Sequence, residues 1–494
     1  MIIIYILLIF IGIVTTLLLI ALINTILIKD KNMSTSELKI DPKTSDSYAK
    51  EFSKMIQIKT LSYDKNKDNS EPFKEMQKVM KEIFPNVYNT LEQTVFKGES
   101  ILFKWKGKSN EKPIVLMAHQ DVVPANKKDW KYNPFSGEVT ETEIHGRGTL
   151  DTKSTLYGFF KAIDELIASG FTPEHDVYIS SSTDEETSGG GAGLSVKALQ
   201  DKGVVPYFVL DEGGAIVSNS LPSAKKPIAL IGVIEKGYVD IKFTAKSNGG
   251  HSSTPPKNSP IVRLSKFITD VENNFPLKTK MIPEVADIFN TAAPSMSFGY
   301  RYLFGNLWLF KSLVTFLLPK INSYGRALLS TTIAFTMSKG SDAENVIPSE
   351  AFVIANLRTH PIQGIEASFK VLESKARKYD IEAKIMSGRE ASPISSTTNE
   401  AYKYLIKIIK ENYPDVLVSP YVMLGGTDCR FFSDITESAF RFSPVRMNND
   451  ELKKIHGKNE SIRKSSLVEA VIFYRELIKN HKWFLHIIKK LKSI

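Results

Sequence analysis

The first 28 residues of the chain, from Met1 to Ile28, contain no charged side chain. About 20 apolar residues are enough for a helix to cross the hydrocarbon core of a bilayer, so this run is long enough for a span. A cleaved signal peptide fits poorly, because no Lys or Arg precedes the run and no small-x-small cleavage site ends it. We therefore expect a single-pass transmembrane anchor at residues 1–28, followed by a polar linker at residues 29–47.

Beyond the linker, short apolar runs alternate with stretches in which apolar residues have helical spacing. Strands are predicted at residues 112–118, 175–182 and 207–210, and a helix is predicted at residues 156–169, before Gly170. Strands that alternate with helices are typical of an α/β fold. We expect a mostly parallel sheet that is flanked by helices on both faces.

The pattern changes after Pro227. Residues 228–234 and 238–245 look like strands, and the second alternates apolar and polar side chains as a half-exposed strand would. The α/β pattern resumes after about residue 365. We expect one domain built from residues 48–235 and 365–480, with a separate α+β unit, residues 236–364, inserted into it.

An apolar patch lies inside the expected insert, at residues 302–318. Lys311 and two polar residues interrupt it, so it is a poor second span. Two alternatives fit it: a buried helix or dimer face, or a surface that meets lipid or an acyl chain. Residues 481–494 mix basic and large apolar side chains and predict a basic amphipathic tail, which either lies on an anionic bilayer or packs on the domain.

The composition narrows the class of protein. The chain has 494 residues, 42% of them hydrophobic and 24% charged, which is ordinary for a globular protein. Its one cysteine, Cys429, excludes an internal disulfide. The formal charge is +10, yet the basic residues are scattered and form no nucleic-acid motif, so we expect no nucleic-acid partner.

Candidate metal ligands follow the predicted strands. His119 comes directly after one strand, and acidic residues follow the next units at Asp151, Glu186 and Asp211, while His456 lies in a loop before the last helix. Strand ends in an open α/β sheet converge where ligands bind. Imidazole and carboxylate groups without a thiolate suit Zn²⁺, Mn²⁺ or Co²⁺ better than they suit a structural zinc site.

The charges in this set are consistent with two divalent ions. Asp151, Glu186 and Asp211 supply three negative charges, and one hydroxide would balance the remaining positive charge. Glu185 is then left without a metal to bind and is free to act as a general base. A dinucleotide loop at residues 189–193 is the rival interpretation, but the carboxylates at residues 184–186 would repel the pyrophosphate.

These motifs resemble the di-zinc exopeptidase and deacylase family that includes aminoacylase, acetylornithine deacetylase, glutamate carboxypeptidase and carboxypeptidase S. The resemblance covers about residues 50–480 and is closest to the branch of carboxypeptidase S and the N-fatty-acyl-amino-acid hydrolases. The motifs that carry it are His119-x-Asp121, Gly146-Arg-Gly-x-x-Asp151-x-Lys153, Asp184-Glu-Glu186, Leu-Asp211-Glu-Gly-Gly, Glu235-Lys-Gly, Gly250-His-Ser-Ser-x-Pro-Pro256, Asn345-Val-Ile-Pro, Gly425-Gly-Thr-Asp428-x-Arg430 and His456-Gly-x-Asn-Glu460.

The resemblance implies a zinc-exopeptidase-like catalytic domain, a lid or dimerisation domain at the insert, and two zinc ions, with Co²⁺ and Mn²⁺ as alternatives. Asp151 would bridge the ions, His119 and Asp211 would complete one, and Glu186 and His456 the other.

The remaining roles are also implied by the resemblance. Asp121 would orient His119, Glu185 would shuttle the proton, and His251 would stabilise the oxyanion, often across a dimer interface in the family. The residues implied to hold the substrate carbonyl and carboxylate are Asn345, Arg358, Gly426, Thr427 and Arg430.

The expected activity is cleavage of an amide bond next to a free carboxylate, in small peptides or N-acyl amino acids. A non-catalytic binding protein on the same scaffold is the alternative.

The charges at Lys29, Asp30 and Lys31 do not orient the anchor. Relatives in this branch often work outside the cytoplasm, so the resemblance implies a membrane protein with an extracytoplasmic catalytic domain and, through the insert, a homodimer.

Overall fold

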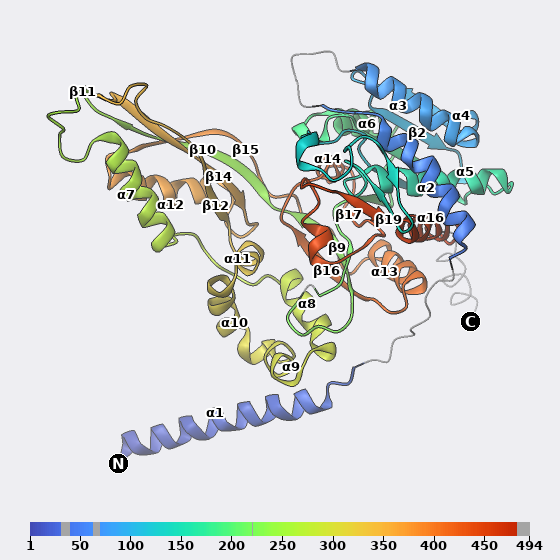
Figure 1. Cartoon of the computed structure of the whole chain (residues 1–494). Coiled ribbons are helices and arrows are strands. Elements are labelled where there is room, and N and C mark those ends of the chain that lie inside the picture. The colour runs from blue at the N-terminus through green and yellow to red at the C-terminus, as the bar shows by residue number, and fades with distance from the viewer. Residues whose placement is uncertain (31–39, 63–69, 220, 482–494) are drawn as a thin grey trace.

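The computed structural model describes residues 1–30, 40–62, 70–219 and 221–481. They form a long N-terminal helix and two folded units, a larger one and a smaller one that projects from it (Figure 1). The predicted basic tail, except for His481, lies outside the described residues, as do residues 31–39 of the predicted linker.

The first helix of the larger unit, α2 (Pro42–Gln57), begins inside the predicted linker. The Asp41 carboxylate caps it by accepting hydrogen bonds from the N–H groups of Lys43 (3.3 Å) and Thr44 (3.2 Å). Pro42 occupies the first helical position, where its missing N–H costs no hydrogen bond. The predicted boundary at residue 47 is therefore too late.

A mixed sheet of ten strands forms the centre of the larger unit, in the order β1-β2-β6-β3-β7-β17-β9-β8-β18, with β16 paired to β9. The pairs β3–β6, β3–β7, β17–β7, β16–β9 and β18–β8 are parallel, and the other pairs are antiparallel. The predicted α/β fold is confirmed, with a mixed sheet. The strand bounds are β1 Glu92–Val95, β2 Ile101–Trp105, β3 Ser109–Met117, β6 His175–Ser181, β7 Phe208–Asp211, β8 Ile216–Val217, β9 Ile228–Glu235, β16 Leu417–Met423, β17 Ala439–Arg441 and β18 Arg446–Met447.

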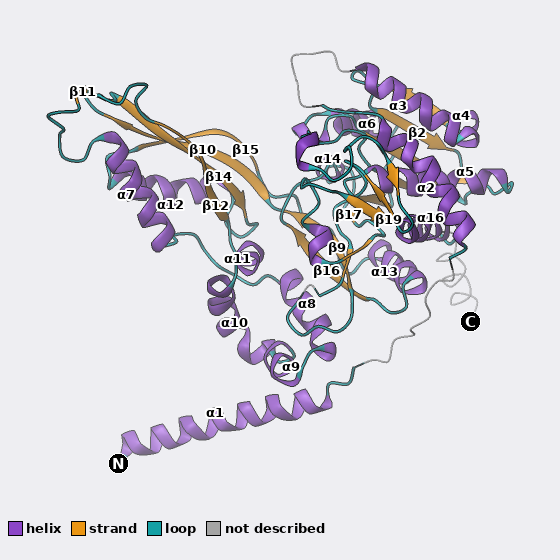
Figure 2. Cartoon of the chain, viewed as in Figure 1, coloured by secondary structure: helices purple, strands orange, loops and turns teal. Residues whose placement is uncertain are grey.

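Alternate side chains of β3 enter two different hydrophobic clusters. Ile114 and Leu116 belong to the main cluster, and Val115 and Met117 belong to the cluster that includes α6 and α14. Successive side chains of a strand point to opposite faces, so the centre of the sheet is buried on both sides (Figure 2). The helices that contribute to the main cluster include α2, α3 (Ser70–Ile83), α4 (Pro85–Thr90), α5 (Lys153–Ala168), α13 (Glu400–Asn412) and α16 (Lys464–Lys479), and those of the second are α6 (Gly191–Asp201) and α14 (Cys429–Phe432).

The smaller unit is a four-stranded antiparallel sheet in the order β12-β14-β10-β15. Val239, Ile241 and Phe243 of β10 are buried against α7 and α12, and the residues between them are half-buried, as the alternating pattern predicts. Because β15 pairs with β10, this unit extends to Arg389, past the predicted boundary at residue 364. The bounds are β10 Gly237–Lys246, α7 Pro260–Asn273, β12 Thr332–Lys339, β14 Glu350–Thr359, α12 Ile365–Arg377 and β15 Glu382–Arg389, with a distal pair, β11 Gly250–His251 and β13 Val346–Ile347.

Residues 283–329 of the predicted insert pack on the larger unit instead. Their buried side chains, among them Phe289, Phe304 and Leu328, share one hydrophobic cluster with the large sheet, and α8 contacts β16. The prediction of one continuous insert is wrong for this stretch, because its apolar residues cover an edge region of the large sheet. Its helices are α8 (Pro283–Ala292), α9 (Phe298–Phe304), α10 (Leu307–Ile321) and α11 (Ser323–Leu329).

Helix α1 (Ile2–Leu27) exposes most of its apolar side chains and contacts α9 through its C-terminal part. Buried Asn306, at the joint between α9 and α10, donates hydrogen bonds to the Ala21 carbonyl (3.1 Å) and the Thr25 hydroxyl (2.9 Å). By length and composition, α1 is the one helix among the described residues that could cross a membrane. The number rises to two if the pair α9–α10, bent by 99°, counts as one span.

A buried ion pair fixes the end of β9, where the chain leaves the large sheet for the smaller unit. Glu235 Oε1 lies 2.9 Å from Arg441 Nε and 3.0 Å from the Thr427 hydroxyl, which donates to it. The side chains of Glu235 and Arg441 are 1% and 0% exposed. A buried charge without a partner destabilises the fold. The ion pair therefore stabilises the junction only while both Glu235 and Arg441 are present.

Glu235→Gln should therefore destabilise the larger unit by about 3–5 kcal/mol, because it leaves the Arg441 guanidinium buried without a counter-charge. The double variant Glu235→Gln/Arg441→Met should recover most of that loss. Urea unfolding followed by circular dichroism measures both. A double variant as unstable as the single one would show that the pair is not what stabilises the junction.

Candidate active site

Three neighbouring strands bring candidate side chains to one edge of the large sheet. His119 follows β3, Glu186 lies in the short turn Glu185–Thr187 after β6, and Glu212 follows β7. Because β3 is parallel to both β6 and β7, the carboxyl ends of all three strands meet at this edge. Asp151, just before α5, and His456, after α15 (Asn449–Leu452), join them from two other segments.

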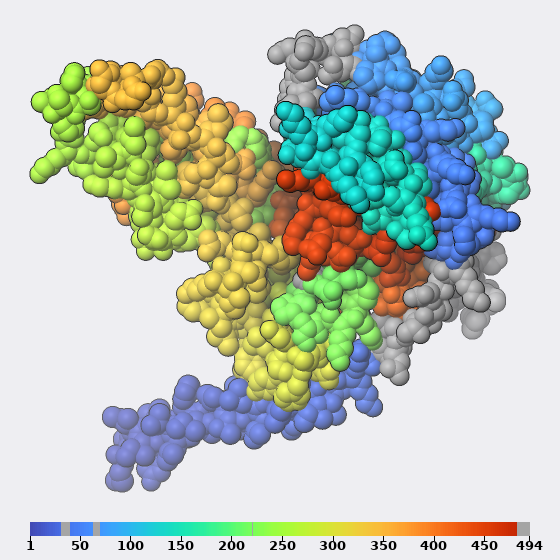
Figure 3. All heavy atoms as spheres, in the orientation of Figure 1, coloured from blue at the N-terminus to red at the C-terminus, as the bar shows by residue number. Residues whose placement is uncertain are grey.

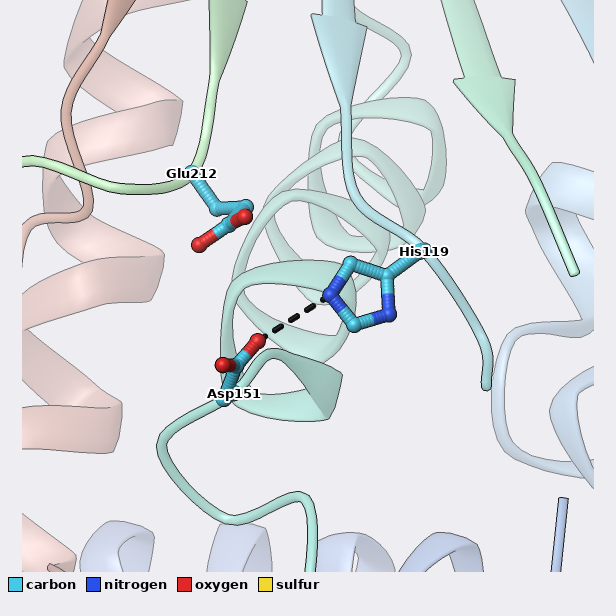
Figure 4. Close-up of side chains that lie close together, drawn as sticks. All are labelled: His119, Asp151 and Glu212. Carbon is cyan, nitrogen blue, oxygen red and sulfur yellow. Dashed lines mark hydrogen bonds and ion pairs between the residues drawn. The ribbon is translucent and has the colours of Figure 1, made fainter. Parts of the chain in front are cut away.

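Asp151 lies between two histidines. Its Oδ1 is 3.0 Å from His119 Nε2 (Figure 4), and its Oδ2 is 3.0 Å from His456 Nε2. The same nitrogen of His456 lies 3.1 Å from Glu186 Oε2. Hydrogen bonds to these two carboxylates raise the pKa of His456 to about 10. The arrangement thus forms two groups that share Asp151: His119 with Glu212, and Glu186 with His456.

The structure corrects the sequence prediction at Asp211. Its Oδ2 accepts a hydrogen bond from the backbone N–H of Cys429 (2.8 Å), and its Oδ1 accepts one from the N–H of Glu212 (2.8 Å). Glu212 is the residue that lies beside His119 and Asp151 (Figure 4). Side chains alternate along a strand, so the last residue of β7 and the next residue point in different directions. The sequence shows the acidic pair, but which of its two side chains faces His119 depends on where β7 ends.

Asp121 connects His119 to the acidic turn. Its carboxylate is 3.3 Å from His119 Nδ1 and accepts hydrogen bonds from the N–H groups of Glu185 (3.2 Å) and Glu186 (3.1 Å). Asp121 is fully buried, so these partners replace the water that it has lost. The predicted neighbour of His119 is therefore in place, and it also fixes the backbone that carries Glu185 and Glu186.

Glu460 holds the loop of Asp151 from the other side, a role that the sequence motif did not reveal. Its Oε2 accepts hydrogen bonds from Arg147 Nη1 (2.7 Å) and the N–H of Gly148 (3.1 Å). Its Oε1 accepts from the N–H groups of Leu150 (2.7 Å) and Asp151 (3.2 Å). Because Glu460 lies four residues after His456, it ties the segments of two candidate ligands together.

The donor set suits divalent metal ions. In each group the ligand atoms lie within 4.8 Å of one another, and all are imidazole nitrogens or carboxylate oxygens. Glu186 Oε1 is buried and has no hydrogen-bond partner among the described residues, and His456 Nε2 faces two acceptor oxygens at once. Cations would satisfy these groups, since buried carboxylates without positive partners are costly.

Glu185 lies beside the two groups without belonging to either. Burial raises the pKa of its carboxyl, and Arg430 Nη1 lies 3.8 Å from Glu185 Oε1. The Arg430 side chain is only 8% exposed and donates to the Thr427 carbonyl (2.7 Å). The structure therefore brings two predicted residues, Glu185 and Arg430, together at the edge of the site.

The other predicted residues of this loop have different surroundings. The Thr427 hydroxyl donates to Glu235 and accepts from the N–H of Cys429 (3.3 Å), so it holds the loop and is not free to contact a substrate. A Cβ on Gly426 would lie 2.6 Å from Arg389 Nη2, so glycine admits this guanidinium. Arg389, 3.8 Å from Glu235 Oε2, was missed because β15 lies beyond the predicted end of the insert.

Two of the three predicted residues of the smaller unit lie at its distal end, apart from the metal groups. His251 and Asn345 are exposed near the distal pair β11–β13, where the Asn345 carbonyl accepts a hydrogen bond from the N–H of Ser252 (3.0 Å). Figure 1 shows this pair at the end of the unit far from the large sheet, and Figure 3 shows an open cleft between the units. Arg358 packs over the Tyr238 ring, 5.4 Å from its centroid.

Neutralising Glu212 and Asp211 in separate variants tests which of the two acids is the metal ligand. Glu212→Gln should lower the affinity for Zn²⁺ by at least about tenfold, because it removes a charge that faces the other ligand atoms. Asp211→Asn, its matched control, should bind Zn²⁺ as the wild type does, because this carboxylate is engaged with the backbone. Chelator competition and metal analysis measure both, on variants whose melting temperatures show that they fold. The opposite order of affinities would restore Asp211 as the ligand.

Comparisons with known proteins identify the family to which the chain is similar. Residues 115–480 match the model of peptidase family M20/M25/M40. The chain is 34% identical over 449 residues to a probable carboxypeptidase S-like 2 of Dictyostelium discoideum, a match that covers 88% of this chain and 85% of the relative. It is 33% identical over 431 residues to the human N-fatty-acyl-amino acid synthase/hydrolase PM20D1, covering 86% of each.

Solved structures show the same fold at low sequence identity. An M20 family metallo-carboxypeptidase of Sulfolobus solfataricus superposes with a TM-score of 0.62 at 17% identity, over 88% of this chain and 98% of the other. A dinuclear metal-binding M20 peptidase of Bacillus subtilis gives a TM-score of 0.55 at 14% identity, over 89% of this chain and 98% of the other. The chain belongs to peptidase family M20/M25/M40.

Proposed function

We propose that this protein is a hydrolase with two divalent metal ions, most simply zinc, that cleaves an amide bond adjacent to a free carboxylate. The observation that carries the proposal is the position of Asp151 between two ligand groups, with the unliganded carboxylate of Glu185 beside them. The relatives named as carboxypeptidases and as an N-fatty-acyl-amino acid synthase/hydrolase support amide substrates of this kind.

The metal ions, Glu185 and Asp121 have separate roles in the proposed reaction. When bound, the ions supply polarisation of the scissile carbonyl and activation of a water nucleophile. Glu185 Oε accepts the proton of the attacking water and returns it to the leaving amine. Burial raises the pKa of this carboxyl, which makes its carboxylate a better proton acceptor than an exposed glutamate. Asp121 keeps the acidic turn in position throughout.

Arginine side chains near the cleft would hold the free carboxylate of the substrate. Arg430 lies beside Glu185, and Arg389 lies over Gly426. Arg358 and Asn345 would add contacts from the smaller unit. A guanidinium can donate two parallel hydrogen bonds to a carboxylate, so each arginine offers both charge and orientation. Cleavage would then be restricted to substrates with a terminal carboxylate.

The exposed position of His251 supports a homodimer as part of this proposal. His251 and Asn345 lie at the distal end of the smaller unit, away from the metal groups of their own chain. A second copy that presents this end to the site would supply an oxyanion donor there. Two-fold symmetry would then complete both sites at once.

Helix α1 is proposed to anchor the enzyme in a bilayer, with the catalytic domain outside the cytoplasm. Its 26 residues correspond to a length of about 39 Å, which exceeds the hydrocarbon thickness of about 30 Å. The side chains of Ile3, Phe10 and Leu19 are more than half exposed, as lipid contact would require. Fractionation with and without residues 1–28, together with protease accessibility, tests the anchor and its orientation.

The proton-transfer role predicts that Glu185→Gln lowers kcat by about 10²–10⁴ and leaves the bound metal unchanged, because Gln cannot accept the proton. Turnover of dipeptides and N-acyl amino acids by zinc-loaded protein, together with metal analysis, measures the two effects. The control Glu174→Gln alters a surface pair with Lys108 and should behave as the wild type does. Near-normal turnover in Glu185→Gln would contradict the role, and metal without any hydrolysis in the wild type would favour a binding protein.

A site shared between two copies predicts recovery when two inactive variants are combined. His251→Ala and Glu185→Gln should each be inactive alone. In a mixed dimer, one site keeps both wild-type residues, so co-expression should restore about a quarter of the wild-type activity. If His251 serves its own chain, no mixed dimer has an intact site and activity stays at the level of the single variants.

A further inference from the structure

A cavity lies between the helices α8–α11 and the large sheet. Its volume is about 780 Å³, within the usual range for sites that bind small molecules. Leu313, Val314, Leu317, Leu318 and Ile321 of α10 line it. These residues lie at positions i, i+1, i+4, i+5 and i+8, so they form one face of the helix.

Two segments that carry candidate metal ligands also line this cavity. Gly213 follows Glu212 directly, and Lys453 lies three residues before His456. Leu230 of β9 and Tyr421 of β16 continue the wall along the large sheet. The cavity therefore lies directly beside the segments that carry Glu212 and His456.

The polar groups of the lining are largely paired with protein partners. The Tyr324 hydroxyl donates to the Tyr421 hydroxyl (3.2 Å), Asn322 Oδ1 accepts from the backbone at the start of α11 (2.5 Å), and Lys453 Nζ lies 2.9 Å from Asp450 Oδ1. Most of the remaining cavity lining consists of aliphatic and aromatic side chains. Such a cavity favours a long apolar group that makes no hydrogen bonds over one that needs polar partners.

We propose that this cavity is the subsite for the acyl chain of an N-acyl amino acid substrate. The proposal rests on the amide-hydrolase function above and adds the place where the apolar half of the substrate is bound. The scissile amide lies at the metal groups, the carboxylate faces the arginines, and the chain extends along α10. The patch at residues 302–318 thus has one face that lines this cavity and another face, on the outside, that includes Trp308 and Phe316.

Filling the cavity tests the proposal. Val314 is 3% exposed and Leu317 is 40% exposed, so Val314→Phe fills the interior, while Leu317→Trp fills the rim, where a larger side chain has room to fit. Phe316→Trp is the matched control on the same helix, because Phe316 is 61% exposed and does not line the cavity. The probes are N-acyl leucines with acyl chains of 2, 6, 10 and 14 carbons, below their critical micelle concentrations.

For the wild type, kcat/KM should rise with chain length, by up to about fourfold for each methylene that the cavity buries. Both filled variants should lower kcat/KM for the 14-carbon substrate at least tenfold and leave the N-acetyl substrate unchanged, while the control follows the wild type. Melting temperatures identify a variant that fails to fold, and either filled variant suffices for the test.

Two results would overturn the proposal while leaving the hydrolase intact. One is N-acetyl turnover with no dependence on chain length in the wild type. The other is a correctly folded filled variant that keeps the wild-type dependence of kcat/KM on acyl-chain length. If the wild type hydrolyses none of the probes and no dipeptide, the proposed function itself fails.

Discussion

The crowding of carboxylates at the end of the sheet is the constraint on which the rest of the site depends. Asp151, Glu186 and Glu212 face one another across two ligand groups, with Glu185 beside them. Burial raises the pKa of both Glu185 and Glu212, and nearby acids add to the effect. Without positive partners such a cluster would tend to take up protons or open. Two histidines and, by proposal, two metal ions make it compatible with a folded chain.

Two other buried acids, Asp121 and Glu460, hold the backbone segments that carry the carboxylates of this cluster. Asp121 accepts hydrogen bonds from the backbone that carries Glu185 and Glu186, and Glu460 accepts them from the backbone that carries Asp151. Asp121 and Glu460 each join segments that are far apart in the sequence. The site is therefore complete only when the C-terminal part of the chain is packed against the N-terminal part. Backbone donors suit this task, because they position the ligand-bearing loops without competing for the metal-facing atoms.

The parts of the site that follow from local sequence were predictable. Strands at β3, β6 and β7 are marked by short apolar runs, and parallel neighbours must end at one edge, so His119 and Glu186 could be placed together. The choice between Asp211 and Glu212 depends on which way the chain turns after β7. The apolar stretch of α8–α11 could belong to either unit by composition alone, and its place against the large sheet is decided by tertiary packing. Arg389 was missed because the pairing of β15 with β10 is also a long-range contact.

The chain crosses between the larger and the smaller unit several times. Between β9 and β15 the chain passes from one unit to the other after Glu235, after α7 and after α11, and it returns to the large sheet after β15. Buried Lys236 links the first of these junctions to the third by donating to the carbonyls of Ala327 (3.0 Å) and Ser330 (2.8 Å). Helices α10 and α11 therefore stay with the large sheet if the smaller unit moves. A substrate would have its scissile amide and apolar end on the larger unit, and closure of the smaller unit would bring Arg358 toward its carboxylate.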